Sequence, residues 1–127
     1  MVNVLCVGAG GFLGSIFRFG LSQGVQRLID RPWMPYGTMA ANLLGCLLIG
    51  FLLSFGESRQ VFGPQARLFL FVGLLGGFTT FSTYEYESFA MMRDGQLAAA
   101  LTNLALQLVV GFAAVWLGHG LGRTIGG

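Results

Sequence analysis

Apolar residues fill four long runs of this chain, and short polar stretches separate them. Each run is near or above the ~20 residues that a membrane-spanning helix requires. The runs cover residues 2–26, 37–56, 67–92 and 97–122. None alternates apolar and polar residues with the period of two that marks a half-buried strand. The pattern predicts an all-α membrane protein with a single domain, residues 1–127, of four transmembrane helices.

The composition and the connections agree with this prediction. Hydrophobic residues make up 54% of the chain and charged residues 9%, against roughly 25% charged residues in a soluble domain. The mean hydropathy is +0.72. The connections hold turn-forming residues, namely Pro32 and Pro35, Gly63 and Pro64, and Asp94 and Gly95. Cys6 and Cys46 lie inside apolar runs, where a free thiol behaves as a small hydrophobe, so we predict no disulfide or metal site from them.

The arginines give no orientation signal. The net charge is +2, and the seven basic residues, all arginines, form no cluster that would bind nucleic acid. One side of the membrane receives Arg59, Arg67 and Arg123, and the other receives Arg27, Arg31 and Arg93. Because orientation normally follows an excess of positive charge in cytoplasmic loops, we infer dual topology, which permits an antiparallel homodimer. The alternative is that a few charges decide the orientation in a way that a count does not capture.

Glycines that allow close helix approach occur in all four runs. They are Gly8, Gly11, Gly14, Gly45, Gly50, Gly73, Gly76, Gly77, Gly111, Gly118 and Gly122. A second copy of the chain would also complete the surroundings of intramembrane polar residues, whose unpaired burial in hydrocarbon is costly. Both features favour the dimer.

The N-terminal stretch VLCVGAGGFLGS resembles the glycine-rich turn of a dinucleotide-binding enzyme. That motif has meaning only inside a strand–turn–helix unit, and here the helical pattern continues without a strand. We therefore interpret Gly8, Gly11 and Gly14 as a packing face. Arg18, in the same run, is an intramembrane cation that needs a carboxylate or a carbonyl partner.

The third run contains the polar stretch GGFTTFSTYEYE at residues 76–87. Two adjacent glycines followed by β-branched Thr79 and Thr80 weaken a helix, so we predict a break near residues 76–80, close to the bilayer midplane. Irregular backbone at that depth must be buried in protein or line a cavity, and its free carbonyls suit a small hard cation. The alternative is a continuous helix that the threonine hydroxyls merely kink.

Helical spacing assigns the residues beyond the break to two faces. Phe81, Tyr84, Glu85 and Ser88 share one, and Thr83 and Glu87 share another. Glu87 lies ~9 Å along the resumed helix, short of the ~15 Å half-thickness of the hydrocarbon core. A carboxylate there is a functional candidate, unless it serves a buried arginine.

Uncharged polar residues also interrupt the second and fourth runs. They are Asn42, Thr102, Asn103 and Gln107. They either make interhelical hydrogen bonds or form a polar track with Ser82 and Thr83.

The segments GTMAANLLG and GGFTTFSTYEYE, with the final glycine-punctuated helix, closely resemble the small fluoride channel family known as Fluc or CrcB, over essentially the whole chain. The resemblance implies a multi-pass protein of the bacterial inner (plasma) membrane that lets fluoride leave the cytoplasm passively. It further implies an antiparallel, dual-topology homodimer with two pores and a central structural sodium ion (Na+).

Site residues follow from the resemblance position by position. The backbone carbonyls of Gly76 and Thr79 would hold the sodium ion, and Arg18 matches the family's first-helix arginine. The fluoride pathway would include Asn42, Phe81, Ser82, Thr83, Tyr84, Glu87 and Asn103. An electropositive ring edge and an amide N–H can both face a small anion.

Some positions depart from the family pattern. Tyr84 stands where Phe is usual, and Glu85 where a small or apolar residue is common. Asn103 replaces a Tyr found in some members, and Gln107 replaces a frequent Ser. A carboxylate at Glu85 would repel an anion unless it is protonated, paired or turned away.

The alternative function is a small dual-topology, proton-coupled multidrug exporter for cationic compounds. Such a carrier places its carboxylate centrally, usually in the first helix, and surrounds it with aromatic residues. The first run here has Arg18 and no acidic residue, although Glu85, Glu87, Tyr84 and Tyr86 keep this function open. A scaffold without transport would leave the intramembrane polar residues unexplained. His119 is the only histidine, and no hydrolytic or redox constellation predicts an enzyme.

Overall fold

The computed structural model describes residues 1–29 and 33–127, so Arg31 and the turn predicted at Pro32 lie outside the described residues. Within the described residues all regular structure is helical. Four spans are long and apolar enough to cross a membrane, which confirms the predicted fold class at this level. The helices are α1 (Val2–Leu28), α2 (Tyr36–Arg59), α3 (Pro64–Arg67), η1 (Leu68–Leu75), α4 (Gly76–Phe78), α5 (Phe81–Arg93) and α6 (Leu97–Gly126).

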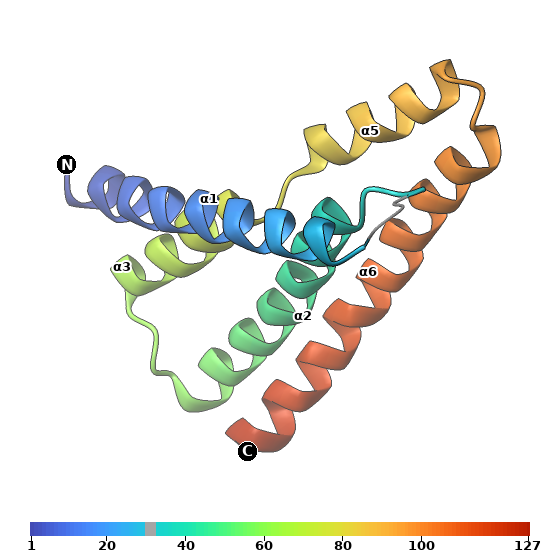
Figure 1. Cartoon of the computed structure of the whole chain (residues 1–127). Helices are drawn as coiled ribbons and strands as arrows, with labels where there is room; N and C mark the ends of the chain where they lie inside the picture. The colour runs from blue at the N-terminus through green and yellow to red at the C-terminus, as the bar shows by residue number, and fades with distance from the viewer. Residues whose placement is uncertain (30–32) are drawn as a thin grey trace.

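The spans associate as two side-by-side pairs (Figure 1). Helix α1 packs along α3, η1 and α4, which together form the first half of the third span. Helix α2 packs along α6, and the two run in the same direction. Helix α5 diverges from the first pair and reaches the beginning of α6. This divergence leaves an open groove between the two pairs.

Glycines set the close contact between α1 and the third span. A Cβ on Gly10 would lie 2.8 Å from the Leu74 amide nitrogen, and one on Gly14 would overlap the Leu74 carbonyl oxygen. Gly8 has nothing within 4 Å of such an atom. Of the predicted face, Gly8 lies away from the contact, whereas Gly11 and Gly14 pack against the third span and Gly10 joins them. Residues four apart follow the straight contact line between two helices, because a turn takes 3.6 residues.

The third span breaks at Thr79 and Thr80, within the predicted range. Thr79 has φ −90° and ψ 158°, and Thr80 has φ −149° and ψ 108°, which is extended backbone. Gly76 and Gly77 remain helical, and a Cβ on Gly77 would lie 2.7 Å from the Gly11 carbonyl oxygen. The glycines thus serve close packing and do not break the helix. The β-branched threonines favour the extended conformation.

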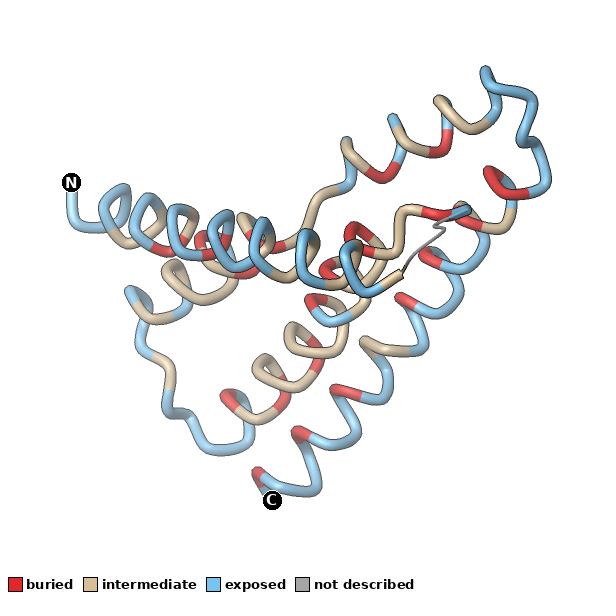
Figure 2. Tube along the Cα trace, in the orientation of Figure 1, coloured by how far each residue is buried: buried red, intermediate tan, exposed pale blue. Residues whose placement is uncertain are grey.

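Few side chains are fully enclosed by the single chain, and exposed positions follow the whole length of α1 and α6 (Figure 2). Large apolar side chains are among the exposed ones, including Phe12, Phe112 and Trp116. In contrast, Asn103 and Ser88 are completely buried. Apolar groups outside and polar groups inside are what a hydrocarbon solvent requires.

Candidate functional site

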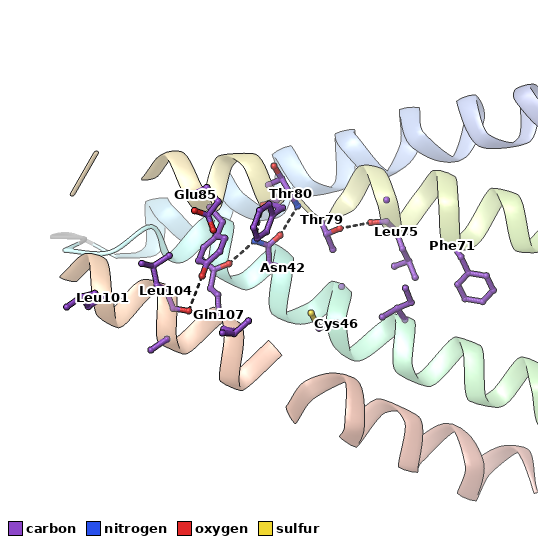
Figure 3. A pocket seen from close by; sticks show the side chains of 17 residues that line it. Asn42, Cys46, Phe71, Leu75, Thr79, Thr80, Glu85, Leu101, Leu104 and Gln107 are labelled. Carbon is purple, nitrogen blue, oxygen red and sulfur yellow. Dashed lines mark hydrogen bonds between the residues drawn. The ribbon is translucent and has the colours of Figure 1, made fainter. Parts of the chain in front are cut away.

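The groove between α2, the third span and the first half of α6 brings most of the polar intramembrane residues together (Figure 3). Its volume is about 870 Å³. Asn42 lies on one wall, Thr79 and Thr80 lie on the second, and Gln107 lies on the third. The remaining lining is largely apolar, so the groove is a hydrophobic cleft with a narrow band of polar groups at the helix break.

Asn42 holds the broken backbone through two hydrogen bonds to Thr80. The Thr80 N–H donates to Asn42 Oδ1 at 2.8 Å, and Asn42 Nδ2 donates to the Thr80 carbonyl at 3.1 Å (Figure 3). The hydroxyl of Thr80 caps helix α5 by accepting from the Thr83 N–H at 3.4 Å. The side-chain amide therefore replaces the helical acceptor that the break removes from the Thr80 N–H, as irregular backbone in a membrane requires.

The same contacts release two carbonyls at the break. In a continuous helix the Gly76 carbonyl would accept from the Thr80 N–H, but that group donates to Asn42. The Thr79 carbonyl would accept from the Thr83 N–H, which donates to the Thr80 hydroxyl. Backbone carbonyl oxygens are hard, neutral ligands that suit a small hard cation. The released groups are those that the sequence resemblance assigns to sodium.

A chain of side-chain amides runs from Asn42 into the protein interior. Asn42 Nδ2 donates to Gln107 Oε1 at 2.7 Å, and Gln107 Nε2 donates to Asn103 Oδ1 at 2.9 Å. Asn103 Nδ2 then donates to Ser88 Oγ at 2.9 Å, and Ser88 donates to the Tyr84 carbonyl at 2.9 Å. The chain ties α2, α6 and α5 together. Interhelical bonding, one of the two alternatives left by the sequence, therefore accounts for three amides.

Phe81 and Tyr84 form an aromatic pair beside this chain. Their ring centroids are 5.7 Å apart and the ring planes are tilted by 55°. The Tyr84 ring is buried, whereas Phe81 is 73% exposed and lines the groove. The Tyr84 hydroxyl donates to the Leu104 carbonyl at 2.9 Å (Figure 3). A phenylalanine could not make this bond, which fixes the ring against α6.

Tyr84→Phe is expected to lower the free energy of unfolding by about 1 kcal/mol, the usual net contribution of one hydrogen bond. The ring and its packing against Phe81 would be retained. The loss can be measured by thermal unfolding of the purified protein in detergent. Tyr86→Phe is the matched control, since Tyr86 lies on the same helix and is 64% exposed. An equal change in both variants would contradict a special contribution from the Tyr84 hydroxyl.

Glu87 is paired with a hydroxyl group. Thr38 Oγ1 donates to Glu87 Oε1 at 2.8 Å, and Glu87 Oε2 is buried without a hydrogen-bond partner among residues 1–29 and 33–127. The alternative was that Glu87 pairs with a buried arginine. Among residues 1–29 and 33–127 the salt bridge is instead the exposed pair Arg93–Asp94, so Glu87 has no arginine partner there. Glu87 is therefore an intramembrane carboxylate with one oxygen available.

Arg18 finds a carbonyl, one of the two kinds of partner that its position predicted. Its Nε donates to the Gly77 carbonyl at 3.1 Å, from α1 to the third span. In a continuous helix the Phe81 N–H would donate to the Gly77 carbonyl, but the break at Thr79 and Thr80 removes this donor. Arg18 thus satisfies one backbone group of the break and brings a positive charge close to it.

The remaining predicted residues are less closely involved. Ser82 is exposed, and Thr83 is half-buried and hydrogen-bonds with Thr80. Glu85 is exposed and lines the groove. The Thr102 hydroxyl donates within its own helix, to the Ala98 carbonyl, and does not join the chain of side-chain amides.

Three groups of the site have contacts that the sequence did not predict, namely Thr38, Thr80 and the Leu104 carbonyl. Thr38 precedes Asn42 by one helical turn, and this spacing could have indicated a shared polar face on α2. Nothing in the sequence indicates which carbonyl of α6 lies opposite Tyr84, because that depends on helix rotation.

Comparison with known proteins shows which family and which relatives this chain is similar to. The family model described as CrcB-like protein, Camphor Resistance (CrcB), matches residues 5–119. A protein of Chloroflexus aurantiacus named fluoride-specific ion channel FluC is 42% identical over 127 residues, covering 100% of both chains. Proteins with the same name from Nitratidesulfovibrio vulgaris and Geotalea daltonii are 41% and 39% identical, each over 98% of this chain and 100% of the relative.

Proposed function

The chain belongs to the CrcB-like protein family, and we propose that it is a fluoride-specific channel of the bacterial plasma membrane. The observation that carries the proposal is the groove at the broken third span. It combines the two hydrogen bonds between the Asn42 amide and Thr80, here called the clasp, with the aromatic pair Phe81 and Tyr84. Full-length similarity to relatives named fluoride-specific ion channels supports it. Passive conduction makes and breaks no covalent bond, so the protein is a channel and not an enzyme.

The groove offers the kinds of group that a dehydrating fluoride ion needs. Fluoride is small and strongly hydrated, so a narrow path must replace its water shell with several weak donors. The electropositive ring edges of Phe81 and Tyr84 meet an anion without a charged side chain. Side-chain N–H and hydroxyl groups of the polar band supply hydrogen bonds. Asn42, Ser82, Thr83, Glu87 and Asn103 complete the proposed pathway.

A structural sodium ion at the break is part of the proposal. The released carbonyls of Gly76 and Thr79 would hold it, and a sodium ion there would add positive charge next to the anion path. The support is the diversion of their helical donors to Asn42 and Thr80. Two other backbone carbonyls at the break have donors within the chain: Asn42 donates to the Thr80 carbonyl, and Arg18 donates to the Gly77 carbonyl.

The proposed assembly is an antiparallel homodimer with two pores. The broken backbone at Thr79 and Thr80 lines an open groove, yet irregular backbone in a membrane has to be covered by protein or face an aqueous cavity. A second copy would cover it, and the equal arginine count allows insertion both ways. A reporter fused to the C-terminus tests this: labelling from one side only would exclude dual topology.

Fluoride efflux from liposomes containing the purified protein, followed with a fluoride electrode, tests the proposed function. Liposomes loaded with chloride are the control. Rapid release of fluoride without release of chloride would support a selective pathway. No release of either ion from folded protein would exclude it, and exchange of cationic drugs would then be the assay for the alternative exporter function.

Phe81→Ile is expected to reduce the initial rate of fluoride efflux by about tenfold, equivalent to ~1.4 kcal/mol. Isoleucine retains bulk and apolar character but removes the polarised ring edge. The measurement is the same liposome assay at matched protein density. Phe19→Ile is the control, because Phe19 is an exposed aromatic residue of α1 away from the groove. Unchanged efflux in Phe81→Ile would contradict edge-on contact with the anion.

A further inference from the structure

Both donor hydrogens of the Asn42 amide are already used. Asn42 Nδ2 donates to the Thr80 carbonyl at 3.1 Å and to Gln107 Oε1 at 2.7 Å. An amide nitrogen carries two hydrogens. An anion in the groove can therefore bind Asn42 only by replacing one of these two acceptors.

The direction of the amide chain follows from its backbone end. The Thr80 N–H can only donate, so the atom of Asn42 that faces it must be Oδ1. Nδ2 of Asn42 then faces Gln107, whose oxygen must accept, and Gln107 Nε2 must donate to Asn103. At the far end Ser88 donates to the Tyr84 carbonyl, which can only accept, and this agrees with the same direction. The atom of Gln107 against Asn42 is thus its oxygen.

Of the two acceptors on Asn42, the Gln107 oxygen is the one that can leave. The Thr80 carbonyl is backbone at a break that Asn42 holds at two points. Gln107 is a side chain with several rotatable bonds, it is 8% exposed, and it lines the groove. Its withdrawal would free one N–H directed toward the groove without opening the clasp.

We propose that Gln107 is an affinity-determining residue, because its Oε1 accepts the Asn42 N–H that would otherwise bind the anion, and fluoride must displace it. Gln107 then acts as an internal competitor, which sets the fluoride concentration at which Asn42 becomes occupied. The proposal rests on the proposed function, since it takes fluoride as the permeating ion.

The consequence is that removing the Gln107 oxygen should strengthen fluoride binding, although it breaks the amide chain. Gln107→Leu has similar size and offers neither acceptor nor donor. The expected half-saturating fluoride concentration falls by about three- to tenfold, the range that one net hydrogen bond gives. If Gln107 were instead a required ligand of fluoride, the Gln107→Leu variant would bind fluoride more weakly.

The experiment is a fluoride titration of purified, ¹⁵N-labelled protein, followed by the NMR signals of the Asn42 side-chain amide. Thr102→Val is the matched control, because the Thr102 hydroxyl donates to the Ala98 carbonyl within α6 and lies outside the amide chain. Gln107→Ser is a second variant in case the apolar side chain prevents folding. Fluoride-free spectra also report whether one Asn42 N–H exchanges faster with water once Gln107 is replaced, as expected.

The outcomes separate this inference from the proposed function. Tighter fluoride binding in Gln107→Leu or Gln107→Ser, with Thr102→Val unchanged, would support the competitor role. Equal or weaker binding in both Gln107 variants, while the unmodified protein binds and conducts fluoride, would overturn the competitor role alone. A protein that neither binds nor releases fluoride would overturn the proposed function and the competitor role together.

Discussion

Asn42→Asp is expected to reduce fluoride efflux by at least about 100-fold, equivalent to ~2.7 kcal/mol. The carboxylate would still accept the Thr80 N–H. Its second oxygen, however, would face the Thr80 carbonyl and Gln107 Oε1, which now accept from Asn42 at 3.1 Å and 2.7 Å. Two hydrogen bonds become acceptor–acceptor contacts, and Gln107 Oε1 loses its donor, at about 1–3 kcal/mol for a buried group left unsatisfied. Reversing the Gln107 amide would relieve only one of them.

The negative charge itself would also oppose an anion at this point of the groove. The liposome assay measures the combined effect, and Asn42→Ala separates its parts, because alanine removes the clasp without adding charge. Asn3→Asp is the matched control for the chemical change, since Asn3 lies exposed near the N-terminus. Fluoride efflux in Asn42→Asp equal to that of Asn3→Asp would contradict both the clasp and the placement of Asn42 beside the anion path.

Gly118→Ala is expected to destabilise the contact between α2 and α6 strongly. A Cβ at Gly118 would overlap the Leu47 carbonyl oxygen and lie 2.9 Å from the Phe51 amide nitrogen. Both are backbone atoms of α2, so no side chain can move aside and the helices must separate. Overpacking of this kind costs about 1–3 kcal/mol or more. We expect the apparent Tm in detergent to fall by on the order of 10 °C.

Separation of α2 and α6 would also move Gln107 away from Asn42, so fluoride efflux should change together with stability. Gly120→Ala is the matched control on the same helix, because a Cβ there has nothing within 4 Å. Alanine at an open helical position stabilises a helix by up to ~1 kcal/mol relative to glycine. A Tm for Gly118→Ala at or above that of Gly120→Ala would show that the close contact is not needed.

The sequence by itself determined the four spans, the break near residues 76–80 and the need of Arg18 for a carboxylate or carbonyl partner. These features depend on local hydropathy, helix propensity and the cost of an unpaired charge in hydrocarbon, all of which can be evaluated within one segment. The resemblance to the fluoride channel family added Asn42, Phe81 and Tyr84 as site residues, and the structure places all three along one groove.

The tertiary structure alone decided which groups face one another. It selected Gly10 over Gly8 for the contact of α1, kept Gly76 and Gly77 helical, and placed Thr38 against Glu87. It also committed both donors of Asn42 to Thr80 and Gln107, which lie 38 and 65 residues away along the chain. Such pairings depend on the rotation and separation of packed helices, because a 3.6-residue period fixes a face but not what lies opposite it.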